Sequence, residues 1–139
     1  MKKVDIKYLN SFKMKKTLFI VLLLCVFSTY TYADAPNCLE NGDDDYCGYT
    51  GKVQSIYVNS GNLVLMYFDT PMDPENAKLA GMQITVPNAG AVSIDQNPEF
   101  AKLFYSTALS AQATKRNVSV QMRGQIGGFP KIDRIWLAE

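Results

Sequence analysis

The segment 97–114 carries the strongest pattern in this chain of 139 residues, and it limits what the segments around it can build. Asn97 offers a side-chain oxygen as N-cap, and Pro98 stands where a missing N–H leaves no bond unmade. Apolar and small residues then follow at helical spacing along one side: Phe100, Leu103, Phe104, Thr107, Ala108 and Ala111. The sequence therefore predicts a helix that covers an apolar surface with one face only.

The segments before and after this helix alternate between apolar and polar residues, as β-strands do. We predict strands at residues 49–58, 63–68, 82–86 with a continuation at 91–94, 118–123 and 131–137, and a single helical turn after Asp73 that ends before Gly81. This order, strand, strand, strand, helix, strand, strand, is that of the five-stranded OB-fold barrel. The predicted fold class is therefore mostly β with one central helix, OB-fold-like. The alternative is another small α+β sheet with one helix laid across it.

Residues 1–33 have the three parts of a secretory signal. Lysines at 13, 15 and 16 form its basic end, residues 18–27 are an unbroken apolar run, and Thr31-Tyr32-Ala33 supplies small residues before a cut after Ala33. Met14 would begin a signal of ordinary length, with an upstream extension before it. Ten apolar residues are half of the roughly 20 that span a bilayer, so we predict export without a lasting membrane anchor.

Removal of this leader changes the charge and the cysteine count of the product. Residues 1–33 hold six lysines and one aspartate, a net charge of +5, whereas residues 34–139 hold eight basic and twelve acidic residues, a net charge of −4. Cys38 and Cys47 remain, and an even pair in an exported chain predicts a disulfide. We expect it to tie down an N-terminal arm, 34–48, in front of the OB-fold-like domain, 49–139. The short loop it closes corresponds to about 3 kcal/mol of stabilisation.

The absence of histidine from the whole sequence removes the common catalytic triads and the usual zinc sites. We therefore expect no enzyme, no cofactor and no metal. The acidic run 43–45 lacks the spaced ligands of a calcium loop and indicates a solvated turn. A net charge of −4 and export both count against nucleic acid as a partner, although OB-folds often bind it.

The mature chain resembles the small OB-fold B subunits of bacterial one-plus-five toxins, in particular the subtilase-cytotoxin and typhoid-toxin group. The likeness lies in the layout of signal, disulfide, strands and helix, and is closest over NPEF (97–100), LFYSTAL (103–109), VSVQM (118–122) and IDRIWL (132–137). The resemblance implies a homo-pentamer whose helices line a central pore, an A-type partner subunit, and binding of cell-surface glycans.

Two pairs of residues are candidates for ligand binding. Phe129 in the glycine-rich loop 124–130 offers an apolar ring, and Gln125 beside it offers a planar amide; sugars are bound by such combinations. Tyr46 and Tyr49 near the disulfide are the second pair. The alternative for each is that the aromatic ring folds back into the core. The function predicted is a secreted or periplasmic oligomeric module that binds glycans. Its rival is a monomeric periplasmic structural or inhibitory protein that binds another protein.

Overall fold

The computed structural model describes residues 35–39 and 45–138, all of which belong to one compact unit, Ala33–Glu139. The predicted signal peptide and the acidic run at 43 and 44 lie outside the described residues. Among the residues that are described, no helix is long and apolar enough to cross a membrane.

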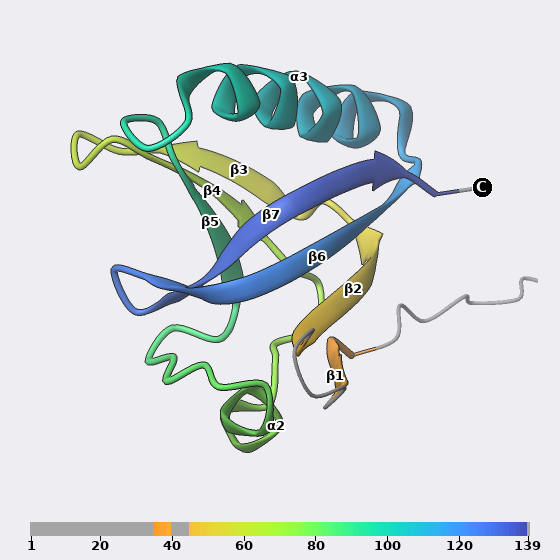
Figure 1. The fold of residues 1–139 in the computed structure, drawn as a ribbon. Helices are drawn as coiled ribbons and strands as arrows, with labels where there is room; N and C mark the ends of the chain where they lie inside the picture. Colours follow the sequence, from red (N-terminus) through yellow and green to blue (C-terminus); the bar gives the residue numbers. More distant parts are fainter. Residues whose placement is uncertain (1–34, 40–44, 139) are drawn as a thin grey trace, which may run out of the picture. The chain divides into compact units, whose positions relative to one another are not determined.

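The described chain is predominantly β, with two helices (Figure 1). One sheet of seven strands has the order β1-β2-β6-β7-β5-β4-β3, in which only β5 and β7 run parallel. The strands are β1 (Asn37–Leu39), β2 (Tyr46–Lys52), β3 (Ser55–Val58), β4 (Leu63–Tyr67), β5 (Ala89–Ser93), β6 (Asn117–Ile126) and β7 (Phe129–Leu137).

The number and order of the strands differ from the predicted five-stranded barrel, and the sheet is not closed. One extra strand arises because the predicted strand 49–58 is interrupted at Val53 and Gln54, which separate β2 from β3. The other is β1, which the N-terminal arm adds beside β2. Cys38 and Cys47 face each other in this β1–β2 pair and form the predicted disulfide.

Residues 82–86, the first part of the predicted third strand, lie outside the sheet, whereas the predicted continuation 91–94 largely coincides with β5. The N–H groups of Thr85 and Val86 both donate to the carbonyl of Gly128, at 2.8 and 3.0 Å. The alternation that indicated a strand is real, because Met82 and Ile84 are buried whereas Gln83 and Thr85 are exposed. A segment that follows the edge of a core shows the same alternation without pairing as a strand.

The predicted loop 124–130 is mostly strand, because β6 and β7 continue to a tight turn at Gly127 and Gly128. Both glycines have positive φ, 59° and 83°, a region that favours residues without a Cβ. A Cβ on Gly128 would also clash with the hydroxyl of Thr85. The turn and the segment 82–86 therefore depend on each other.

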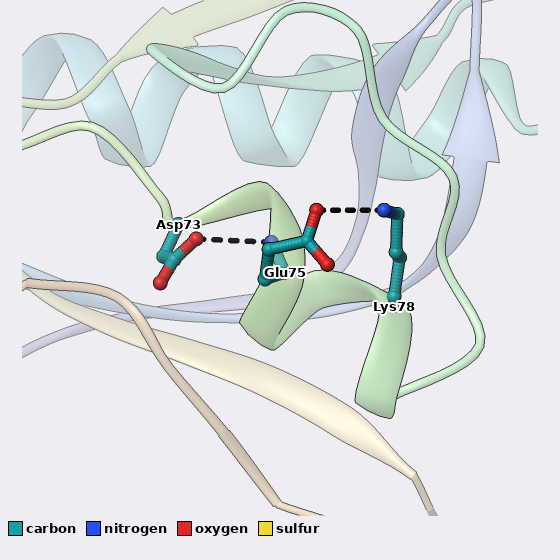
Figure 2. Close-up of polar contacts among 3 residues, drawn as sticks. All are labelled: Asp73, Glu75 and Lys78. Carbon is teal, nitrogen blue, oxygen red and sulfur yellow. Dashed lines mark hydrogen bonds and ion pairs between the residues drawn. The ribbon is translucent and has the colours of Figure 1, made fainter.

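The short helix predicted after Asp73 is present as α2 (Pro74–Leu79). Figure 2 shows its cap: the Asp73 carboxylate accepts a hydrogen bond from the backbone N–H of Glu75 at 2.9 Å. The Glu75 carboxylate in turn lies 2.6 Å from the Lys78 ammonium. Cap, proline and ion pair are all local, which is why the sequence indicated this helix.

The long helix is α3 (Pro98–Thr114), and its predicted start is confirmed: Asn97 accepts a hydrogen bond from the N–H of Phe100 at 3.0 Å. The helix contacts strands β3 to β7 and lies along one end of the sheet (Figure 1). Its buried residues are Ala101, Phe104, Ala108 and Ala111. Leu103, predicted to belong to the buried stripe, is 66% exposed. The buried face is thus rotated towards the alanines.

Candidate functional site

The structure does not bring the side chains of Gln125 and Phe129 together on one face. Gln125 lies opposite Pro130, and Phe129 lies opposite Ile126, so the two side chains point to opposite faces of the β6–β7 hairpin. The side-chain oxygen of Gln125 accepts a hydrogen bond from the backbone N–H of Gln83. Gln125 therefore helps to hold the segment 82–86, and Phe129 is half-buried at the start of β7.

Tyr49 belongs to the core, as the alternative for it proposed. Its side chain is 2% exposed, and its ring centroid lies 4.6 Å from that of Phe68. The hydroxyl oxygen lies 2.7 Å from both the Lys52 carbonyl and the Asp69 carboxylate. Burial, and then the hydrogen bond to the Asp69 carboxylate, raise the pKa of Tyr49 far above its ordinary value of 10.0.

Tyr46 is half-buried on the outer side of β2, and the guanidinium carbon of Arg123 lies 5.4 Å from its ring centroid. This distance fits a cation–π contact. Arg123 also pairs with Asp133, at 2.8 Å between guanidinium nitrogen and carboxylate oxygen. Tyr46 therefore lies beside Arg123, which connects it to Asp133.

A pocket lined by varied side chains lies between β5, β7 and the start of α3. The parallel strands β5 and β7 pair at a single position, Ala91 with Lys131, and a cavity of about 400 Å³ lies beside this contact. Its lining comes from three elements and the loop between two of them: Val92, Ser93, Gln96, Asn97, Phe100, Lys131, Ile132 and Asp133. We refer to it as the polar pocket.

Asp133, which lines the polar pocket, has a carboxylate oxygen that accepts no hydrogen bond from the described residues. One carboxylate oxygen is bound by Arg123, whereas the other, Oδ1, is buried and has no hydrogen-bond partner among the described residues. Asp133 occupies this place because the β6–β7 register shifts between Gln121 and Met122, which adds one residue to β7. A buried oxygen without a partner costs free energy, so it favours a ligand or water that donates to it.

Donors and an apolar wall complete the lining. Asn97 uses its side-chain oxygen as the α3 cap, which leaves its NH₂ group free to donate. The Ser93 hydroxyl accepts from the Gln96 N–H at 3.2 Å and keeps its own proton for a further bond. Phe100 is half-buried, with its ring centroid 6.2 Å from that of Phe104. A carboxylate, two amides, a hydroxyl, an ammonium and an aromatic ring suit noncovalent recognition of a hydroxyl-rich ligand.

Two further cavities lie at other places along α3. An apolar groove of about 230 Å³ is lined by Val58, Val64, Ile94, Pro98, Ala101, Lys102 and Tyr105. The second cavity lies at the opposite end of the helix and is lined by charged groups. In the described part of the chain, no three acidic, histidine or cysteine residues come together in a way that could hold a metal ion.

Comparisons with protein-family models, with curated proteins and with solved structures found no match. The resemblance to toxin B subunits therefore stays a prediction, and the polar pocket has to be judged on its own chemistry. Sequence reasoning did not find this pocket, because Ser93, Gln96 and Asp133 come from separate segments. The one signal available was Asp133, the single carboxylate in the predicted strand 131–137.

Proposed function

We propose that this protein is an exported binding module that recognises a glycan through the polar pocket. The observation that carries the proposal is the buried Oδ1 of Asp133, an acceptor without a partner among the described residues, on a side chain that pairs with Arg123 and belongs to the lining of the pocket. Sugar hydroxyls are such donors, and the Phe100 ring offers an apolar surface for the C–H face of a sugar. The disulfide between Cys38 and Cys47 supports an oxidising compartment, secreted or periplasmic.

The proposal includes an OB-fold-like architecture. Strand pairs β3–β4, β4–β5, parallel β5–β7, β7–β6 and β6–β2 support it, because they follow the OB-fold order if β2 and β3 are counted as one bent strand. Only Val53 and Gln54 separate those two strands. The β1 strand is then an addition at the disulfide.

We also propose that the module works as a toxin B-subunit-like oligomer, a homo-pentamer that accepts an A-type subunit. What supports assembly is the outer face of α3, where Leu103 and Leu109 are 66% and 45% exposed. Apolar side chains gathered on an exposed helix face are typical of interaction surfaces. The rival function, a monomeric protein that binds another protein, uses the same face.

Glycan binding is tested on an array of immobilised glycans with the disulfide-bonded protein and two carboxylate variants. Asp133→Asn removes the charge in the pocket, and we expect at least a tenfold loss of affinity, since a charged hydrogen bond contributes about 1.5 to 3 kcal/mol. Asp95→Asn is the matched control, because Asp95 is exposed and does not line the pocket. Equal affinities of both variants, or no glycan bound by the unaltered protein, would reject the proposal.

Light scattering of the same protein separates the two assemblies. A mass five times that of the mature chain favours the ring, and Leu103→Ser combined with Leu109→Ser should then reduce it. A monomeric mass would remove the support for B-subunit-like assembly and favour the rival.

A further inference from the structure

The cavity at the C-terminal end of α3 is strongly cationic. It has a volume of about 310 Å³ and lies between the end of β2 and the last turn of the helix. Lys52, Lys115 and Arg116 line it together with two uncharged amide side chains, Gln54 and Gln112. We refer to it as the cationic pocket. No acidic residue is among its lining residues.

The three cations differ from most others in the described chain because no carboxylate there pairs with them. Lys78, Lys102 and Arg123 each lie within 2.8 Å of a carboxylate oxygen. Within residues 35–39 and 45–138, no such ion pair is formed by Lys52, Lys115 or Arg116. Three positive charges in one cavity, without a carboxylate partner among the described residues, repel one another. Their repulsion favours an anion from outside.

Backbone carbonyls hold two of the three side chains, those of Lys52 and Arg116, near the cavity. The Lys52 ammonium donates to the carbonyl of Lys115, which ends α3 in the left-handed conformation with φ 58°. The Arg116 guanidinium donates to the Ala138 carbonyl at 3.3 Å. An ammonium has three donors and a guanidinium has five, so each group keeps donors after these bonds. The helix end contributes about half a negative charge, which is much less than the three positive charges opposite it.

We propose that the cationic pocket binds a tetrahedral oxyanion group, a sulfate or phosphate ester carried by a larger ligand. Such a group has several acceptor oxygens, a charge of −1 to −2, and a geometry that the planar fork of Arg116 matches with two parallel hydrogen bonds. The Gln112 amide donates to the Gln54 carbonyl at 3.2 Å, which leaves the side-chain oxygen of Gln112 and the Gln54 amide to meet uncharged parts of the carrier. The pocket lies at the opposite end of α3 from the polar pocket and does not depend on the proposed glycan site.

The test measures binding to the full disulfide-bonded protein at constant ionic strength. The probes are inorganic sulfate, inorganic phosphate, a sulfated oligosaccharide, and vesicles that contain phosphatidic acid, with chloride and neutral vesicles as controls. Backbone amide resonances of Lys115 and Arg116 should shift with both ions. A sulfated oligosaccharide that binds at least tenfold more tightly than free sulfate identifies a glycan as carrier, and the same gain for phosphatidic acid vesicles over phosphate identifies a lipid headgroup.

A matched pair of variants shows whether the site is specific. Lys115→Gln combined with Arg116→Gln should weaken binding at least tenfold and should leave glycan binding through the polar pocket unchanged. Arg134→Gln is the control: Arg134 also has no carboxylate ion pair in the described chain, and it lines neither the polar pocket nor the cationic pocket. Equal losses for both would show attraction by overall charge only. That result, or no gain for either carrier over the free ions, would overturn the proposal.

Discussion

The two faces of α3 are built from different residues and meet different surroundings. The face towards the sheet has three alanines around Phe104, all of them buried, so the helix approaches the strands closely. The outer face has Leu103 and Leu109 among serines, and the Ser106 hydroxyl donates to the Leu103 carbonyl at 2.9 Å. The inner face therefore explains why the domain folds. The outer face, with two exposed leucines, is the surface on which the proposed assembly depends.

The largest test of this difference compares two neighbouring apolar residues. Phe104 is 0% exposed, and Phe104→Ala should lower the free energy of unfolding by about 3 to 5 kcal/mol, through lost burial and the cavity left behind. Leu103→Ala should lower it by about 0.5 kcal/mol or less, since Leu and Ala differ little in helix propensity and the site is exposed. Urea denaturation of both variants, at one protein concentration, measures the two losses. Similar losses would show that α3 has no distinct inner face.

The second test concerns the sheet beneath the inner face. A Cβ on Gly90 would lie 2.6 Å from Cδ1 of Ile132, so Gly90 is what allows β5 to approach β7. We expect Gly90→Ala to cost about 1 to 3 kcal/mol, the usual range for an overpacked core. Gly48→Ala is the control, because its nearest atom is 3.9 Å away, an ordinary contact. Thermal unfolding of the two variants should differ clearly, and equal melting temperatures would contradict the close approach.

The sequence predicted α3 well because its signals are local. Asn97 and Pro98 mark the start, and the cap bond to Phe100 is within one turn. The exact buried face was not predicted. The pattern favoured Leu103 because its apolar side chain is larger, but the residue that lies against the sheet is Ala101, whose side chain is small enough to fit there. Side-chain size matters more than hydrophobicity where a helix approaches a sheet closely.

Contacts distant in the chain account for the rest of what the sequence did not predict. Residues 82–86 have the pattern of a strand, but Gly128 and Gln125, some 40 residues later, bind their N–H groups. Because the Gln125 side chain makes one of these contacts, it does not lie beside Phe129 as the sequence predicted. The polar pocket depends on a shift in the β6–β7 register that brings Asp133 to its edge, and no local pattern encodes that shift.

A smaller effect is expected from the buried hydroxyl of Tyr49 in β2. Tyr49→Phe should cost about 1 kcal/mol at neutral pH by removing a hydrogen bond. Because folding raises the pKa of Tyr49, its contribution is complete below pH 10 and is lost as the pH rises above that value. Stability measured from pH 8 to 11 should therefore fall less steeply for Tyr49→Phe than for the unaltered protein. Tyr57→Phe, at an exposed site, is the control and should follow the unaltered protein. If stability fell with pH equally steeply in Tyr49→Phe and in the unaltered protein, a buried, protonated Tyr49 would be contradicted.

The smallest expected effect lies at the border between the two faces. Lys102 pairs with Glu99 at 2.8 Å, but the two side chains are 71% and 79% exposed, and an exposed ion pair contributes about 0.5 kcal/mol or less. Lys102 also lines the apolar groove with Ala101 and Tyr105, so its methylene groups have a surface to cover. Lys102→Ala removes both the charge and the methylenes, whereas Lys102→Met keeps most of the apolar chain.

We expect losses of about 0.5 kcal/mol or less for both Lys102 variants in urea denaturation, which would place Lys102 on the outer face. A loss well above this for Lys102→Ala but not for Lys102→Met would mean that the lysine stem packs in the groove and that the inner face extends to Lys102. A loss for both would assign the effect to the ion pair with Glu99 at the first turn of α3, where the charge of Glu99 already faces the positive end of the helix. The boundary between the inner face and the outer face of α3 would then depend on charge rather than on packing.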